Sequence, residues 1–384
     1  MKALSAELGA GLRALEQAQW HAARQSFESV LSVGESPEAR DGLGLAVWFL
    51  GEVAEAIALR EQAFQLYADA RRCDDAARTA VWVSHQHYVG GRVSAARGWL
   101  ARAERALEGV PDGAGHGWVA VERARHASSV EDQIRHAARA VEIARRTQTD
   151  DLEVFAVSLL GRAEVAAGRA ERGMELLEEA MAAATAGRVR NVHTLAEAYC
   201  NLIMACTHAG EWERAAEWCE LVDEFARAHE AAPLFGTCRS VHADVLVATG
   251  HWPEAERALE SALATHARYV PEMGAPTVAS LAELRVYQGR LADAERLLAG
   301  REEHPSSLRA LALLRIAEGR PHSAVSLLER GLDASGGDAM AATQQLAALA
   351  DARLACGDVE GARSAADDLA DLASSSGIRL VTAR

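Results

Sequence analysis

The most constraining feature of the sequence is a short motif that recurs along almost its whole length. Each copy has a glycine, an apolar residue two positions later and an alanine five positions later, as in GEWERA and GHWPEA. Successive copies start 30 to 42 residues apart. Self-similarity at such a period indicates a chain built from tandem structural units rather than from one globular core. The strict copies start at Gly51, Gly91, Gly210, Gly250, Gly289 and Gly357, and the weaker ones at Ala18, Asp132, Gly168 and Gly319.

The motif predicts a tight turn between two antiparallel helices. Glycine adopts the left-handed backbone conformation that commonly ends a helix. The alanine then begins the contact face of the next helix, where a longer side chain would hold the two backbones apart. Further small residues recur at fixed offsets, such as Gly44 and Ala63 on either side of Gly51. Small residues at these offsets allow close helix packing. We therefore expect ten helical hairpins, with about twenty helices and no β-sheet.

The composition supports an all-α protein and argues against several classes of partner. Apolar residues make up 49% of the 384 residues, prolines number only 8, and the formal net charge is -15. Such a chain can bury a core, and an acidic surface repels phosphate backbones, so no nucleic-acid partner is expected for this segment. The sequence shows no signal-peptide core, no apolar stretch long enough for a membrane span and no C-x-x-C motif. We expect a cytoplasmic protein with reduced thiols and no membrane contact.

With its small, glycine, apolar and alanine positions, the repeat resembles the tetratricopeptide repeat. The resemblance covers nearly the whole chain and implies a right-handed superhelix, or α-solenoid, whose first helices form a concave wall. Most copies are spaced more widely than the usual 34 or so residues, so longer helices or extended loops are expected. We expect one domain over residues 1–384, with looser joints near 109–117 and 331–338. Packing should be irregular at the copy starting at Asp132, because Arg125 replaces its small residue.

The same resemblance suggests which side chains line the groove, because fixed positions of each first helix face inward in tetratricopeptide repeats. Aromatic residues, histidines, arginines and acids gather at these positions between the second and sixth repeats. One interpretation is a ligand-binding wall, and the alternative is ordinary packing or a solvated surface. The residues predicted to bind a ligand are Trp48, Phe49, Arg78, His85, Tyr88, Glu122, His126, Phe155, Arg162, Met204, Thr207 and Asp244.

Known catalytic and metal-binding motifs are not found in the sequence. On a helix, His85 and His87 point about 200° apart, so the SHQHY segment does not predict a metal site. No H-E-x-x-H, P-loop or G-x-S-x-G motif occurs. We therefore expect no metal, no cofactor and no enzymatic activity.

Three segments resemble a group of bacterial LuxR-type transcriptional regulators more closely than a generic repeat does. They lie at 26–70, 176–225 and 281–300, and the middle one is the most specific. The resemblance implies a long tetratricopeptide-like region that senses a signal and relays it to a C-terminal helix-turn-helix. The sequence ends at Arg384 without a segment of that kind, so we expect either an excised sensor region or a stand-alone relative.

Three functions remain open at this point. The first is a non-enzymatic sensor module of a LuxR-like regulator that binds a small molecule or partner in the groove, which thermal melts against a metabolite panel would test. The second is a scaffold that binds a peptide or helix, although the wall is poor in the lysines and asparagines of peptide-carboxylate clamps. The third is an enzyme or drug-binding protein using His85, His126, Glu122 and Arg162.

Overall fold

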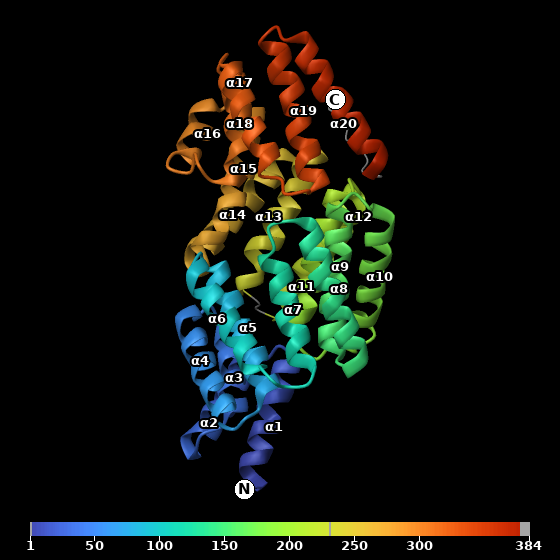
Figure 1. Ribbon diagram of the computed structural model, residues 1–384. Helices are drawn as coiled ribbons and strands as arrows, with labels where there is room; N and C mark the ends of the chain where they lie inside the picture. The colour runs from blue at the N-terminus through green and yellow to red at the C-terminus, as the bar shows by residue number, and fades with distance from the viewer. Residues whose placement is uncertain (1, 230–231, 377–384) are drawn as a thin grey trace.

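The computed structural model describes residues 2–229 and 232–376, and this part of the chain consists of α-helices joined by short turns. Within these ranges, twenty α-helices form ten antiparallel hairpins that stack in chain order into a right-handed α-solenoid. Figure 1 shows the stack running from the blue N-terminal end to the red C-terminal end. The all-α superhelix expected from the repeat is therefore confirmed, and the described residues contain no β-strand.

The first helix of each hairpin contributes to the concave side of the superhelix. These helices are α1 (Lys2–Glu16), α3 (Pro37–Phe49), α5 (Cys73–Val89), α7 (Ala114–His126), α9 (Asp150–Ala166), α11 (Val192–His208), α13 (Ala232–Ala248), α15 (Gly274–Tyr287), α17 (Leu308–Ala317) and α19 (Ala339–Ala355). Short 3-10 helices, η1 (Pro271–Met273) and η2 (Pro305–Ser307), lead into α15 and α17.

The second helices pack on the outside of the first helices. They are α2 (Trp20–Val33), α4 (Val53–Asp69), α6 (Val93–Ala106), α8 (Val130–Thr147), α10 (Ala170–Thr185), α12 (Trp212–His229), α14 (Trp252–Tyr269), α16 (Leu291–Leu298), α18 (Pro321–Asp333) and α20 (Val359–Ser376). None of the described helices combines the length and the apolar character needed to cross a lipid bilayer.

The motif glycines end the first helices as the sequence predicts. Eight hairpins turn through a motif glycine with a positive φ, between 70° and 84°. At Gly51 the amide donates to the carbonyl of Trp48 at 3.0 Å, and the amide of Glu52 donates to the carbonyl of Val47 at 2.9 Å. These two bonds form a Schellman cap, which requires the left-handed conformation at the glycine. In the first hairpin Ala18 takes this position, with a φ of 54°.

One copy of the motif is misplaced in the sequence interpretation. The turn of the fourth hairpin lies between α7 and α8, before Asp132 is reached, and α8 begins at Val130. The Oγ of Ser129 accepts a hydrogen bond from the Asp132 amide at 3.2 Å. Because this serine is an effective N-cap, α8 starts earlier than the motif implies and Asp132 lies in its first turn. Ala137 still packs fully buried against the neighbouring helices, as the alanine position of the motif requires.

Both segments that the sequence predicts as looser joints form hydrogen bonds with other hairpins. In the first joint α7 begins at Ala114, and the Gly115 amide donates to Asp74 Oδ1 at 2.7 Å. In the second, the Val130 amide donates to the carbonyl of Gly336 at 3.2 Å, which joins the connector before α19 to the start of α8. It remains a prediction that these two joints are looser and that residues 1–384 form one domain.

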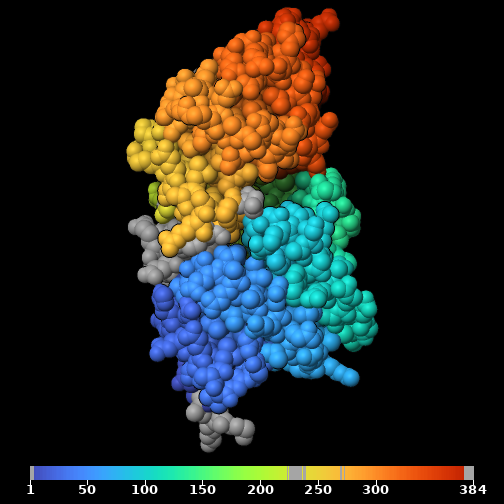
Figure 2. Space-filling model, turned by 90° about the vertical axis from the view of Figure 1, so that its left-hand side faces the viewer, coloured from blue at the N-terminus to red at the C-terminus, as the bar shows by residue number. Residues whose placement is uncertain are grey.

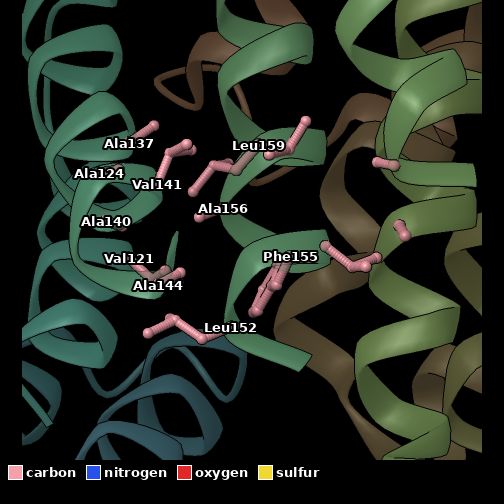
Figure 3. Packing of buried hydrophobic residues seen from close by; sticks show 14 of the residues in the cluster. Val121, Ala124, Ala137, Ala140, Val141, Ala144, Leu152, Phe155, Ala156 and Leu159 are labelled. Atoms are coloured by element: carbon pink, nitrogen blue, oxygen red, sulfur yellow. The ribbon is translucent and has the colours of Figure 1, made fainter. Parts of the chain in front are cut away.

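Close contact between helices depends on the small residues of the repeat. A Cβ atom added to Gly173 of α10 would lie 2.5 Å from the carbonyl oxygen of Gly161 on α9. This crossing therefore tolerates only glycine at both positions. Around it, the largest apolar cluster brings together side chains of helices from α5 to α13. Figure 3 shows part of this cluster, where Phe155 and Leu152 of α9 face side chains of α7 and α8.

The superhelix curves tightly enough for hairpins far apart in the sequence to touch. The rings of Trp82 on α5 and His193 on α11 have their centroids 4.3 Å apart. Val192 and Val270 join the apolar cluster formed by the first three helices. At the level of α5, α7 and α11, side chains from opposite walls therefore meet inside the superhelix.

Candidate functional site

A group of ionisable and hydrogen-bonding side chains lies where the inner faces of α5, α7 and α11 meet. We call it the central polar cluster. Its members come from helices of the second, third, fourth and sixth hairpins, so the curvature of the superhelix brings them together. They are Arg60, Ser84, His85, Glu122, Arg125, His126, His193 and Glu197.

Glu122 is the most deeply buried charge in this cluster, and its side chain has no exposed surface. Ser84 Oγ donates a hydrogen bond to its Oε1 at 2.8 Å, and His126 Nε2 lies 3.2 Å from the same atom. Arg125 donates to Oε2 at 3.2 Å. Burial alone would raise the pKa of Glu122, but His126 and the charge of Arg125 lower that pKa to about 2. Glu122 is therefore ionised at neutral pH.

Glu197 of α11 joins the second half of the cluster. Arg125 lies 3.3 Å from its Oε2, so one guanidinium bridges the carboxylates of Glu122 and Glu197. The Nε2 atoms of His85 and His193 each lie 3.5 Å from Glu197 Oε1. Burial opposes ionisation, yet the charge of Arg125 and the imidazole of His193 hold the pKa of Glu197 well below its usual value. Burial lowers the pKa of His193 to about 4, which keeps this imidazole neutral.

Arg60 and Arg78 form the N-terminal edge of the site around one carboxylate. Arg78 donates to Asp41 Oδ2 at 3.0 Å, and Arg60 Nε lies 3.6 Å from Asp41 Oδ1. Burial lowers the pKa of Arg60 to about 10, which still leaves it charged. Its Nε and Nη1 atoms are buried without a hydrogen-bond acceptor among the described residues. Nε is in an ion pair with Asp41, but a buried guanidinium donor without a hydrogen bond is costly, so Nη1 favours an acceptor supplied from outside the chain.

Aromatic rings enclose the charged groups. The Trp82 ring is 1% exposed and contacts His193, while the guanidinium carbon of Arg125 lies 4.5 Å from the ring centroid of Phe155. Tyr88 stacks on His126 at 4.7 Å, and 41% of Tyr88 is exposed. Cation–π contacts of this kind stabilise a buried arginine and fix its orientation. The Tyr88 side is therefore where the cluster approaches solvent.

The structure brings together five of the twelve residues predicted to bind a ligand. His85, Tyr88, Glu122, His126 and Phe155 all contact or border the central polar cluster. Arg78 lies at its edge through Asp41, as described above. These five residues therefore lie close together, and their contact with a ligand remains a prediction.

Other predicted residues lie away from the cluster or use their polar groups locally. Trp48 and Phe49 are buried in the N-terminal apolar cluster, where Phe49 stacks on Trp20 at 4.1 Å. Thr207 Oγ1 donates to the carbonyl of Met204 on the same helix at 2.7 Å, so its hydroxyl is used locally.

Arg162 borders the central polar cluster, whereas Asp244 lies outside it. Burial lowers the pKa of Arg162, and the charges of Glu197 and Asp338 partly offset this. Asp244 lies on α13, and burial raises its pKa to about 7 although a hydrogen bond from Ser280 opposes the rise.

Sequence reasoning did not identify three of the cluster's important residues. Arg125 was expected only to disturb the packing, yet it links two carboxylates. Arg60 lies on a second helix, which the groove pattern does not consider. His193 stands four residues before Glu197, and this spacing places both on one helix face. That i, i+4 pair is a sequence signal that could have indicated this half of the site.

The molecular surface is not uniformly convex. Figure 2 shows the surface hollowed between the cyan part of the chain and the orange C-terminal part. The C-terminal connector reaches back toward the middle of the chain, where Gly336 accepts the hydrogen bond from Val130 described above.

The arrangement favours binding over proton-transfer chemistry. Both cluster carboxylates have pKa values far below neutral and are held by Arg125, so neither is suited to act as a general acid near pH 7. The buried arginine donors and the neutral imidazole of His193 instead suit recognition of a carboxylate or carbonyl group, or of a cation that prefers nitrogen and oxygen ligands.

Comparison with known proteins supports the repeat assignment. The family model described as Tetratricopeptide repeat matches residues 8–63, which run from α1 into α4. A search of curated proteins finds no match. The matched segment is well under half of the chain, so it identifies a repeat of this type within the protein.

Solved structures share the fold over nearly the full length. A crystal structure of Rap protein complexed with Competence and Sporulation Factor aligns with a TM-score of 0.61 at 12% identity, covering 98% of this chain and 99% of that one. The APC/C hetero-tetramer Cut9–Hcn1 aligns with a TM-score of 0.50 at 13% identity, covering 95% of this chain and 86% of that one. At these identities the likeness establishes a tetratricopeptide-like solenoid and nothing finer.

Proposed function

We propose that this protein is a non-enzymatic sensor and interaction module that binds a short peptide or a small carboxylate-bearing molecule at the central polar cluster. The observation that carries the proposal is the buried Nη1 donor of Arg60, which has no hydrogen-bond acceptor among the described residues, whereas Nε lies 3.6 Å from Asp41 Oδ1 in an ion pair. A ligand carboxylate would supply the missing acceptor, and charge-assisted hydrogen bonds to arginine are among the stronger polar contacts in proteins. The similarly folded Rap protein was solved with Competence and Sporulation Factor bound, which supports a sensing role for such a solenoid.

The relation to the sensor region of LuxR-type regulators is part of this proposal. It rests on the sequence resemblance at 176–225, a segment that contains α11 with both His193 and Glu197. In a protein of that kind, the ligand would change the packing of α5, α7 and α11 and so alter contacts with a partner. Direct nucleic-acid binding is not proposed, because the chain carries a net charge of -15.

Thermal melts of the purified full chain test the proposal with a defined probe. A pool of short peptides with free C-terminal carboxylates is compared with the same pool carrying C-terminal amides. Ligand that binds only the folded state raises the melting temperature by mass action, so the free-carboxylate pool should raise it and the amidated pool should not. Equal shifts of the melting temperature from both pools would contradict the carboxylate model. It would also be contradicted if neither the free-carboxylate pool nor a set of small organic acids changed the melting temperature.

A matched pair of variants ties the effect to the site. Arg60→Met keeps much of the apolar stem that packs near Trp82 but removes the guanidinium donors, so the ligand-induced shift should disappear. Arg102→Met removes an exposed arginine that lies over Trp99, outside the cluster, and should leave the shift unchanged. A shift that survives in Arg60→Met would place the ligand elsewhere.

A further inference from the structure

Three potential metal ligands converge within the central polar cluster. Among the residues that the structure describes, His85, His193 and Glu197 form the group whose ligand atoms all lie within 4.8 Å of one another. The Nε2 atoms of the two histidines each lie 3.5 Å from Glu197 Oε1. We propose that these residues form a binding site for one divalent transition-metal ion, of which Zn²⁺ is the reference case.

The ligand set and its spacing suit such an ion. Two imidazole nitrogens and one carboxylate oxygen are typical of zinc and neighbouring first-row metals, whereas calcium and magnesium favour oxygen ligands alone. In a tetrahedral site, bonds of about 2.0–2.2 Å place ligand atoms about 3.4 Å apart. Two of the three separations here are 3.5 Å, so an ion would fit after a small movement of side chains.

The surrounding elements hold these ligands in place. His193 and Glu197 lie one helical turn apart on α11, and α5 supplies His85 from the facing wall. Trp82 packs against the His193 ring, which restricts its rotation. Arg125 is paired with Glu197 through Oε2, which leaves Oε1 directed toward the two imidazoles. Such contacts from outside the ligand set orient metal ligands in proteins.

The two imidazoles keep unused hydrogen-bonding capacity in this arrangement. Both Nε2 atoms lie 3.5 Å from Glu197 Oε1, which is longer than an ordinary hydrogen bond near 3 Å. The Nδ1 atoms of His85 and His193 are also buried without partners among the described residues. Three protein ligands leave a fourth position for water or for an oxygen atom of a bound molecule.

Spectroscopy on the full-length protein tests the site without any substitution. After treatment with EDTA and its removal, the chain is titrated with Co²⁺, and separately with Zn²⁺ by calorimetry. We expect one ion per chain, visible d–d bands of a nitrogen and oxygen site, and no thiolate-to-metal charge-transfer band. A charge-transfer band would assign the ion to cysteine, and no binding of either metal would overturn the proposal outright.

Variants locate the ion. His85→Gln and Glu197→Gln, which keep similar side-chain volumes, should each weaken Zn²⁺ binding by about 10-fold or more. His87→Ala removes the neighbouring histidine of α5 that points away from the site, and it should bind Zn²⁺ as the unaltered chain does. Circular dichroism confirms that each variant folds. Unchanged Zn²⁺ affinity in both His85→Gln and Glu197→Gln would refute the assignment. A loss of Zn²⁺ affinity in His87→Ala alone would show that the ion binds at a different site.

Failure of the metal site and failure of the proposed function are separable. The peptide melts described above are run on EDTA-treated protein, and the metal titrations contain no peptide. A chain that binds peptide and no metal therefore rejects only the metal site, and the reverse result rejects only the carboxylate ligand.

Discussion

The substitution Glu122→Gln measures how much the buried charges at the centre of the molecule stabilise the fold. Glu122 is fully buried, and its pKa of about 2 lies well below the ordinary value of 4.5. Each unit of pKa difference corresponds to about 1.4 kcal/mol of preference for the ionised form. The charge of Glu122 should therefore contribute about 3 kcal/mol to the free energy of unfolding at pH 7, and glutamine should lose it.

The stability difference between the unaltered chain and Glu122→Gln should depend on pH in a defined direction. A carboxyl whose pKa is lowered by folding stabilises the protein above the unfolded-state pKa, and the contribution is lost as the pH falls from about 4.5 toward 2. The difference between the unaltered chain and Glu122→Gln should thus shrink from about 3 kcal/mol at pH 7 to about 1.5 kcal/mol at pH 3. Urea unfolding followed by far-ultraviolet circular dichroism at both pH values measures it.

The control is an ion pair on the outer side of the same helix. Arg123 pairs with Glu104 at 2.8 Å, but both side chains are well exposed, so Glu104→Gln should change stability by less than about 1 kcal/mol. A Glu122→Gln variant no less stable than Glu104→Gln at pH 7 would refute the reasoning. A stability loss in Glu122→Gln that stays the same at both pH values would show that packing or hydrogen bonding, and not charge, is responsible.

Further substitutions test the helix crossing, a hairpin turn and a second ionisable group. Gly173→Ala should cost about 1–3 kcal/mol in urea unfolding, because its Cβ would lie 2.5 Å from the carbonyl oxygen of Gly161. Gly98→Ala, where the added Cβ meets open space inside a helix, should instead be neutral or stabilising by up to about 1 kcal/mol. Gly250→Ala should cost about 1–2 kcal/mol, because the residue has a φ of 83°. Asp244 has a pKa raised to about 7 by burial, so its stabilising effect is present at low pH and is lost as the pH rises through 7. Asp244→Asn should therefore melt higher than the unaltered chain at pH 8, and this advantage should disappear toward pH 4.

Much of the architecture follows from local rules and could be predicted. Gly51 and Gly210 each end a first helix with a positive φ. This turn is predictable because it depends on the local backbone conformation, which glycine adopts readily. Where the local signal is ambiguous, prediction fails, as at Asp132, because the Ser129 cap competes with the motif and starts α8 early.

The candidate site could be predicted only in part. The inward positions of first helices correctly brought His85, Glu122 and His126 to one region, because helix periodicity fixes which face a residue occupies. Neither Arg60 nor Arg125 could be assigned in this way. Their roles depend on carboxylates contributed by other helices, and no repeat pattern contains that information.

The sequence by itself therefore determined the repeating hairpins and their turns. These features depend on residues within one hairpin or between adjacent ones. Only the tertiary structure decided that α11 meets α5 inside the superhelix and places His193 beside Trp82. The physical reason is that a small rotation between neighbouring hairpins accumulates along the stack, so contacts between distant hairpins depend on the sum of all intervening packing angles.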